Sequence, residues 1–463
     1  MAFDVASVRA QFPILRRTVR TLDGRDRPLV YLDHGASTHA PQPVIDAVVQ
    51  TLSHSYANIH RANHTLSVES SDHFDAACET LLDFVGADPT THCAVLGQNT
   101  TMALDVAAHV MADVPGKTLT TLMEHHSNDL PHRARGAVVH ADVDDQGRVD
   151  LGDVEAKLER GGIKLVAVTG ASNVSGYVPP LHKLARLAHD HDARILVDAA
   201  QLYAHRPIDV KPASHPEHID FLAAAGHKAY APLGSAMLVG PREVLDAASP
   251  YMPGGGTVEW VTRKDVGFTK SPDRHMGGTP NIVGAIAFGA ATEFLAKIGM
   301  TKIQSHEQAM LKHAMKRFAE LDDEHGIRLL GPRSPKEKVG VLSFDVPGRR
   351  HELVSSILSH EFGIATRNGC FCAQPMLNRL LGLGDDPVWA REIGAGKDVP
   401  RPGAVRATIG VYNTEDELDQ LCDALDVIGK GAEKGRYKEG TRMCEPIDLP
   451  ALVPSKKGAK KAR

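Results

Sequence analysis

A lysine and an aspartate thirty residues apart carry the clearest chemistry in this sequence. Lys228 lies in the glycine-punctuated apolar run 225–234, and Asp198 ends the apolar run 194–197. A lysine amine becomes a nucleophile toward carbonyl carbon when it is desolvated or lies beside another charge. A carboxylate at the end of a buried strand suits the ring nitrogen of pyridoxal 5′-phosphate (PLP), whose aldehyde a lysine holds. The pair therefore favours a PLP-dependent enzyme.

Strands and helices must alternate to position these two residues. Residues 164–169, 181–191 and 194–197 read in turn as strand, helix and strand. Such alternation predicts an α/β fold with a parallel sheet covered on both faces. Ligands of such sheets bind beyond the carboxyl ends of the strands. Asp198 and Asn173 follow two of the predicted strands, and His125 follows a third, so all three are expected at one site.

The pattern changes after about residue 290. Two long helical patterns are followed by three strand candidates, and a last helix opens with a capping box, Thr414 to Glu417, and runs to about Ile428. The helices are expected over 284–298 and 302–324, and the strands over 340–346, 363–366 and 404–411. This order of helices and strands predicts a second, smaller α+β domain.

Composition bounds the class of protein. The chain has 463 residues, 42% of them hydrophobic, which is enough for two or three domains. No run approaches the roughly eighteen apolar residues of a membrane span, and residues 1–20 lack the apolar stretch of a signal peptide. Six cysteines do not form a disulfide framework in so long a chain. We expect a cytoplasmic protein that binds no membrane and keeps its thiols reduced.

The charge is unevenly distributed. The net charge is −5, yet residues 430–463 hold ten Lys or Arg and only four Asp or Glu, so the rest of the chain is acidic. An acidic body argues against nucleic-acid binding. Residues 430–463 are expected to be a basic, disordered tail, with docking to another protein as the alternative.

Several motifs in order resemble one family. Besides Asp198, Gln201, His227 and Lys228, the motifs are residues 31–33, 58–67, 124–128 and 367–375, the last reading Arg-Asn-Gly-Cys-Phe-Cys-Ala-Gln-Pro. Together they resemble the cysteine desulfurases and selenocysteine lyases of the class V aminotransferase group, in particular the subgroup with a short cysteine-bearing loop. The resemblance spans about residues 10–428.

The resemblance implies a fold and a division into domains. The fold would be that of fold type I PLP enzymes, an α/β architecture whose large domain has a mostly parallel seven-stranded sheet beside a smaller α+β domain. The expected division is 1–25 as a segment that packs with the small domain, 26–290 as the large PLP-binding domain, 291–429 as the small domain with the cysteine loop, and 430–463 as the tail.

The resemblance also implies roles for individual residues. Lys228 would hold PLP and move the proton on Cα, with His125 stacked on the ring. The other residues expected to bind PLP are Asp198, Gln201, His227, Thr100, Thr101 and Asn173, with Thr279 reaching a partner's phosphate across a homodimer. Arg406 and Arg367 would bind the substrate carboxylate, beside Asn173, because a planar guanidinium suits a carboxylate. No metal site is expected. His189 and His191 are interpreted as a solvated helix end, since no further ligands are evident.

Cys372 distinguishes a cysteine desulfurase from other PLP enzymes with such a site. Its thiolate would attack the sulfur of bound L-cysteine or L-selenocysteine and keep a persulfide for an acceptor protein. The spacing of Cys370 and Cys372 places both side chains on one strand face if the segment is extended. Cys370 would then relay the persulfide or have no role.

Two features depart from the family pattern. Ala225 stands where a serine is usual, which removes one hydroxyl from the phosphate site. The segment 376–402 is longer than in the short-loop subgroup and is expected to bear on substrate choice.

Three functions are therefore in competition. The favoured one is a cysteine desulfurase, a sulfur-transferring enzyme. The second is a class V PLP enzyme that performs transamination, racemisation or another C–S cleavage on a different amino acid. The third is a non-catalytic partner protein.

Overall fold

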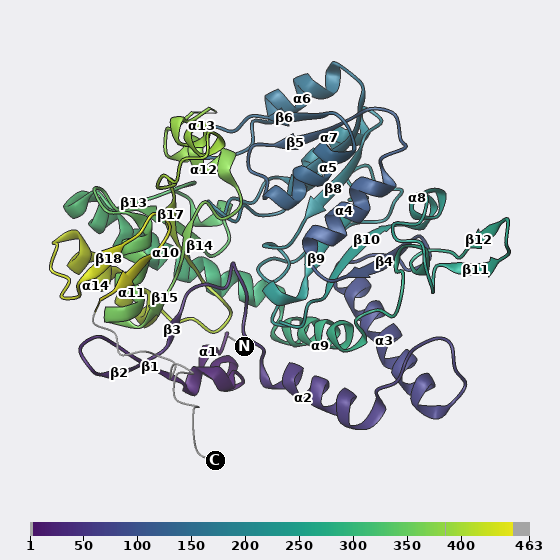
Figure 1. Cartoon of the computed structure of the whole chain (residues 1–463), viewed down its shortest axis with the longest axis horizontal. Coiled ribbons are helices and arrows are strands. Elements are labelled where there is room, and N and C mark those ends of the chain that lie inside the picture. Colours follow the sequence, from purple (N-terminus) through teal and green to yellow (C-terminus); the bar gives the residue numbers. More distant parts are fainter. Residues whose placement is uncertain (1–2, 385, 448–463) are drawn as a thin grey trace, which may run out of the picture.

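The structure, a computed structural model, describes residues 3–384 and 386–447. Within them the largest sheet has seven strands in the order β4-β10-β9-β8-β7-β5-β6, and helices cover both of its faces (Figure 1). Strand β10 is antiparallel to both neighbours, and the other neighbours are parallel to each other. The predicted α/β fold with a mostly parallel sheet is confirmed. The strands are β4 (His92–Gly97), β5 (Lys117–Thr121), β6 (Val138–Ala141), β7 (Ile163–Thr169), β8 (Arg194–Asp198), β9 (Phe221–Ala225) and β10 (Ala236–Pro241).

Both faces of this sheet are buried. Along β7, Val166 and Val168 pack into one hydrophobic core, whereas Leu165 and Ala167 pack into another. Successive side chains of a strand point to opposite faces, so a strand covered on both sides needs a continuous apolar run. The first core includes residues of α3 (Thr65–Phe84), α6 (Leu151–Glu159), α7 (Leu181–His189) and α9 (Ile282–Ile298), and the second includes residues of α4 (Thr100–Val110) and α8 (Arg242–Ala247).

A second, antiparallel sheet forms the smaller core. Its order is β13-β14-β17-β16, and three helices cover it. The elements are α10 (Met300–His325), β13 (Arg328–Leu329), β14 (Val341–Asp345), α11 (His351–Phe362), β16 (Arg367–Gly369), β17 (Ala404–Thr408) and α14 (Glu415–Gly429). The predicted capping box is confirmed at Thr414 and Glu417. This core also takes in Val30 and Leu32, from within the predicted large domain, because β3 (Val30–Tyr31) pairs with β15 (Ile364–Ala365).

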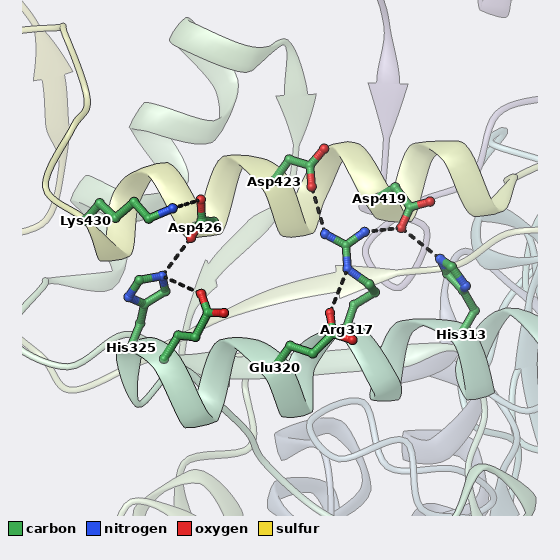
Figure 2. Close-up of polar contacts among 9 residues, drawn as sticks. His313, Arg317, Glu320, His325, Asp419, Asp423, Asp426 and Lys430 are labelled. Carbon is green, nitrogen blue, oxygen red and sulfur yellow. Dashed lines mark hydrogen bonds and ion pairs between the residues drawn. The ribbon is translucent and has the colours of Figure 1, made fainter.

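A polar seam fixes α14 along α10, as Figure 2 shows. The Arg317 guanidinium lies 2.7 Å from the Asp423 carboxylate, 3.3 Å from Glu320 and also against Asp419. Several charges sharing one planar guanidinium hold a geometry that an isolated exposed ion pair does not. The seam lies beside the apolar contact of the two helices and so sets their register.

The N-terminal segment contacts the smaller core. It comprises α1 (Val5–Ala10), η1 (Pro13–Arg16) and the hairpin of β1 (Thr18–Arg20) and β2 (Asp26–Pro28). Arg9 pairs with Glu417 at 2.9 Å, and the Leu22 amide donates to the His360 carbonyl at 2.8 Å.

The prediction that residues 430–463 form a disordered tail is wrong for residues 430–447. They form a hairpin of β18 (Tyr437–Glu439) and β19 (Cys444–Pro446) that packs on α11. Glu361 accepts hydrogen bonds from the Lys434 and Gly435 amides and from the Tyr437 hydroxyl. Charge composition alone does not reveal such long-range contacts, which offset the entropy of ordering the segment. The basic run 456–463 lies outside the described residues.

The remaining elements are short connections. They are α2 (Gln42–Gln50), η2 (Thr51–Ser55), η3 (His126–Asn128), α5 (Leu130–Arg135), η4 (Gly226–Lys228), β11 (Val258–Val261), β12 (Val266–Phe268), η5 (Asp273–His275), η6 (Pro335–Glu337), α12 (Gln374–Leu380) and α13 (Val388–Gly394). No single helix among the described residues is long and apolar enough to cross a bilayer; α9 and α10 pass that test only as a pair bent by 74°.

A buried lysine limits the stability of this fold. Lys338 is 0% exposed, and its Nζ has no hydrogen-bond partner among the described residues. Burial lowers the pKa of Lys338 from 10.5 to about 8, so the folded protein still holds a charged, desolvated amine at pH 7. At about 1.4 kcal/mol per pKa unit, we expect Lys338→Met to raise the free energy of unfolding by about 3 kcal/mol at pH 7.

The pH dependence of this gain checks its cause. Between pH 8 and 10.5 the unfolded chain binds a proton on Lys338 that the folded chain has lost, so wild-type stability rises with pH. The advantage of Lys338→Met, measured by urea denaturation, should therefore shrink as pH rises from 7 to 9.5. A gain that stays constant over this range would contradict the assignment.

Candidate active site

One cavity lies at the carboxyl edge of the large sheet. It has a volume of about 460 Å³ and opens between the two sheets. Of the residues expected at the site, it is lined by Thr100, Thr101, His125, Asn173, Asp198, Gln201, His227, Lys228, Arg367, Cys372 and Arg406. The structure therefore brings together eleven of the twelve, as binding beyond the carboxyl ends of parallel strands requires.

Thr279 is the exception. It lies in two other cavities, one of which it shares with Arg61 and Gly256. A single chain therefore does not place Thr279 beside Lys228.

Lys228 and Asp198 form the charged floor of the cavity. Lys228 follows β9 in the short turn η4, and Asp198 is the last residue of the adjacent parallel strand β8. Burial lowers the pKa of Lys228 to about 8, against the opposing effect of Asp198. Burial raises the pKa of Asp198, although the Ala200 amide, 3.0 Å away, donates to its Oδ1. The amine is therefore closer to its uncharged, nucleophilic form at neutral pH than a free lysine is.

His125 is held as a neutral imidazole. Its Nδ1 accepts a hydrogen bond from the Ser127 amide at 3.1 Å, and burial, with Lys228 nearby, lowers the pKa of His125 to about 3. The neutral ring then carries its proton on Nε2. Beneath it, burial raises the pKa of Glu124 to about 8, and Glu124 accepts hydrogen bonds from Thr121 and Asn128. This buried network fixes the turn that carries His125.

A helix end and three hydroxyl groups form an anion-binding corner. Asn99 caps α4 by accepting from the Met102 amide, and Thr100 and Thr101 follow it. The Thr101 hydroxyl lies 2.7 Å from that of Ser127, and the buried Thr100 hydroxyl has no hydrogen-bond partner among the described residues. Unpaired amides and hydroxyl groups at a helix N-terminus suit a phosphate.

Ser127 is a site residue that the sequence reasoning missed. It lines the cavity, whereas Ala225 does not. Ser127 therefore supplies a hydroxyl group to the anion-binding corner. Its signal in the sequence is its place in the motif 124–128, two residues after His125.

Two arginines share one aspartate at the opposite wall. The Asp33 carboxylate lies 2.7 Å from the Arg367 guanidinium and 3.7 Å from that of Arg406. Arg406 also donates to the Asn173 carbonyl at 3.0 Å, and its Nε has no hydrogen-bond partner among the described residues. Burial lowers the pKa of Arg406 to about 10, which leaves it charged at neutral pH. The pair can bind a carboxylate, and Asp33 is a second residue that the sequence reasoning missed.

The cysteine loop is not an extended strand. Strand β16 ends at Gly369, and Phe371 and Cys372 both have φ of 54°. Such left-handed backbone is rare for residues with side chains and persists only where the surroundings fix it. The condition under which Cys370 and Cys372 would share one strand face, an extended segment, is therefore not met. Cys372 is exposed at the cavity, and Cys370 is half-buried.

Contacts from the large domain hold this loop. The His126 amide donates to the Cys372 carbonyl at 2.7 Å, and the Asn173 side chain donates to the Phe371 carbonyl at 2.6 Å. The Phe371 ring lies 4.9 Å from the Arg406 guanidinium, within the range of a cation–π contact. The thiol is thus carried on a fixed backbone without being buried itself.

Gln201 and His227 complete the lining. Gln201 Nε2 donates to the Gly35 carbonyl at 2.7 Å, and burial lowers the pKa of His227 to about 4. Of the described residues of the segment 376–402, none lines the cavity. That segment instead forms α12 and α13 and contacts the large domain, for example from Arg379 to the Val143 carbonyl at 3.5 Å.

Comparisons with known proteins agree on one family. Residues 30–421 match the family model for aminotransferase class-V. A probable cysteine desulfurase of Mycolicibacterium paratuberculosis is 35% identical, and the match covers 93% of this chain but only 59% of that protein. A cysteine desulfurase of Haloferax volcanii is 33% identical, with 91% of this chain and 96% of that protein covered.

Solved structures give the same result. The apo structure of a cysteine desulfurase from Thermococcus onnurineus is 30% identical with a TM-score of 0.80, and covers 93% of this chain and 100% of that one. The cysteine desulfurase CsdA of Escherichia coli, in an S-sulfonic acid form, is 30% identical with a TM-score of 0.76, and covers 94% of this chain and 100% of that one.

Proposed function

We propose, from the premise that this chain belongs to the class V aminotransferase family, that it is a PLP-dependent cysteine desulfurase. It would convert L-cysteine to L-alanine and leave the sulfur as a persulfide on Cys372. The observation that carries the proposal is the position of Cys372. Its exposed thiol lines the same cavity as the half-buried amine of Lys228 and the guanidinium of Arg406. A PLP enzyme that only moves protons or amino groups needs no thiol there.

The residues of the cavity fit PLP. An amine with lowered pKa, a buried carboxylate at a strand end, and a helix N-terminus with an unpaired threonine hydroxyl match its aldehyde, ring nitrogen and phosphate. Lys228, Asp198 and Thr100 would supply these groups. Gln201, His227, Thr101, His125 and Asn173 would complete the contacts. When bound, PLP joins the substrate amino group and accepts the electron pair released at Cα.

Arg406 and Arg367 orient the substrate. Bidentate binding of its carboxylate fixes Cα and points the side chain along the cavity. Asp33 keeps both guanidinium groups in place when no carboxylate is bound, because it pairs with each. The Lys228 amine and the Cys372 thiol line the same cavity, so both can reach a substrate held there.

Lys228 moves the proton. When the substrate is bound, the Nζ atom of Lys228 is free to accept the proton of the substrate Cα. Burial lowers the pKa of Lys228, which favours the uncharged amine that this step needs. The same amine later returns a proton to carbon. His125 is held neutral with its proton on Nε2, so this nitrogen can donate a hydrogen bond within the cavity.

Cys372 takes the sulfur. Its thiolate forms an S–S bond with the substrate sulfur while the substrate C–S bond breaks, and the electron pair of that bond stays with carbon, which gains a proton. The balance is L-cysteine plus thiol to L-alanine plus persulfide. Two equivalents of an added thiol then reduce the persulfide, giving sulfide and a disulfide. L-selenocysteine would react in the same geometry.

An assay of both products tests the proposal. Purified protein loaded with PLP is incubated with L-cysteine and dithiothreitol, and alanine and sulfide are measured. We expect the two in equal amounts, and the Cys370→Ala variant to match wild type. Pyruvate with ammonia, turnover of another amino acid without sulfide, or no turnover would overturn the assignment and support the competing functions.

Arg406→Lys is expected to weaken substrate binding selectively. A lysine ammonium keeps the charge but loses the planar pair of donors, so KM for L-cysteine should rise roughly 10- to 100-fold. Steady-state kinetics with L-cysteine measures this rise, and the exposed Arg391→Lys is the matched control. An unchanged KM would contradict the carboxylate role.

We further propose a homodimer. Thr279 lies outside the cavity of its own chain, in a pocket beside Arg61, as it must if it serves a partner's phosphate. Exposed apolar side chains occur on the elements around that pocket, namely Leu52, Tyr56, Leu66, Trp260 and Val261. Light scattering should give twice the chain mass of 49.8 kDa, and a monomer would refute the role of Thr279. A cytoplasmic location and an acceptor protein remain predictions.

A further inference from the structure

A cluster of histidines lies at the edge of the large sheet opposite the active site. His189 ends α7, and His218 and Asp220 precede β9. One ligand atom from each of these three residues lies within 4.8 Å of the other two. The expectation that His189 ends a solvated helix without further ligands is therefore wrong. The neighbours come from a loop almost thirty residues away, which the sequence did not connect to it.

The hydrogen bonds leave the Nε2 atoms of both rings facing the same carboxylate. His189 Nδ1 lies 2.9 Å from the Pro216 carbonyl, and His218 Nδ1 lies 2.7 Å from the His215 carbonyl. A carbonyl only accepts, so Nδ1 carries the proton in each ring, and in a neutral ring Nε2 is a lone pair. Those Nε2 atoms lie 3.0 and 3.5 Å from the Asp220 carboxylate. Main-chain bonding of Nδ1 with Nε2 left free is the arrangement of metal-binding histidines.

Without a cation between them, one ring must carry a proton on both nitrogens to donate to Asp220, as His189 Nε2 does at 3.0 Å. The other ring, stacked with its centroid 4.1 Å away, then faces the carboxylate with a lone pair or becomes a second imidazolium beside the first. A divalent ion satisfies both lone pairs and the carboxylate at once. Asp220 is only 2% exposed, and its carboxylate accepts hydrogen bonds from the Ile195 amide at 2.8 Å and from Arg194 at 3.0 Å.

A third histidine, His92, lies beside this cluster. His92 is 3% exposed, and it lines a cavity together with His218 and Asp220. Its Nδ1 forms a hydrogen bond of 2.9 Å with the Thr91 hydroxyl, and its Nε2 is buried with no hydrogen-bond partner among the described residues. A buried ring nitrogen without a partner costs free energy that a ligand in this cavity would recover.

We propose that His189, His218 and Asp220 bind one divalent transition-metal ion such as Zn²⁺, with His92 beside the open coordination position. Two imidazoles and one carboxylate are a common set of three protein ligands for zinc. The positive charge of Arg194, 3.0 Å from Asp220, opposes the ion, and Glu243, 3.7 Å from the same guanidinium, offers it a second carboxylate partner. The ion would link α7 and the loop before β9 to the amino ends of β4 and β8.

Metal titration of the holoenzyme tests the site. Chelator-treated protein is titrated with Zn²⁺ and with Co²⁺, and bound metal is counted after desalting. We expect one ion per chain, a cobalt spectrum of tetrahedral nitrogen and oxygen ligands without a sulfur charge-transfer band, and a Zn²⁺-dependent rise in melting temperature. Both His189→Gln and His218→Gln should lower the affinity at least 10-fold, whereas His191→Gln, on the same helix end, should bind as wild type.

The opposite results overturn the proposal. Substoichiometric metal, a sulfur band that assigns the ion to the cysteines, or equal affinity in all three variants would leave only an ion pair between the histidines and Asp220. The variant His92→Gln tests the role of His92 separately. It should weaken metal binding less than His218→Gln does, and it should change the cobalt spectrum. An unchanged spectrum would show that His92 does not contact the ion.

Discussion

Replacing Cys372 by alanine should lower sulfide release from L-cysteine by at least about 10³-fold, because the variant lacks the only nucleophile proposed to take the sulfur. The Lys228 amine and the two arginines remain in the cavity. The substrate should therefore still bind, and its Cα proton should still exchange with solvent. Sulfide and alanine assays measure the first effect, and mass spectrometry of cysteine recovered from deuterium oxide measures the second.

Cys370→Ala is the matched control for this result. Cys370 is two residues away on the same loop but is not among the residues that line the cavity. Its removal should change sulfide release less than about threefold, since no bond in the proposed reaction involves it. If Cys372→Ala retains sulfide release, Cys372 is incidental and another C–S cleavage must operate. If Cys370→Ala is equally inactive, the two thiols act together.

Lys228→Ala should have the second large effect. Loss of the amine removes both the covalent hold on PLP and the proton carrier, so turnover should fall by at least about 10⁴-fold. Borohydride treatment of wild type should attach PLP to the peptide that contains Lys228, as peptide mass spectrometry detects. The variant should show no such peptide. A small added amine such as methylamine should restore part of the activity by replacing the lost base.

The control for Lys228 is Lys338→Met. Lys338 is fully buried and Lys228 is half-buried, and desolvation lowers both pKa values to about 8, but only Lys228 lines the cavity. Lys338→Met should therefore keep the activity and the trapped peptide. If Lys228→Ala kept the activity or the borohydride-trapped peptide, a residue other than Lys228 would hold PLP or move the proton.

The sequence predicts those parts of the fold that depend on local pattern. The run 164–169 is a strand because burial on both faces demands continuous apolar residues, and Thr414 with Glu417 caps a helix because both groups lie within one turn. In both cases the signal is contained in a few neighbouring residues. The site residues were predicted differently, from the resemblance of the ordered motifs to a family, and eleven of them line one cavity.

Contacts between distant residues could not be predicted in the same way. Asp33 pairs with Arg367 across 334 positions, and nothing near Asp33 indicates that partner. The left-handed backbone at Cys372 depends on His126 and Asn173, which belong to the other domain. The hairpin at 437–446 depends on Glu361. Composition predicted disorder there because it takes no account of such partners.

The small core has a consequence for the order of events on the ribosome. Val30 and Leu32 leave the exit tunnel early, yet they pack with residues such as Leu342, Ile364 and Leu418. Strand β3 must therefore wait for its partner while more than three hundred further residues are translated, since only then can β15 pair with it. The two arginines meet Asp33 only at that stage. A nascent chain can thus expose Cys372 before it can bind a substrate carboxylate, which separates synthesis of the thiol from the onset of sulfur chemistry.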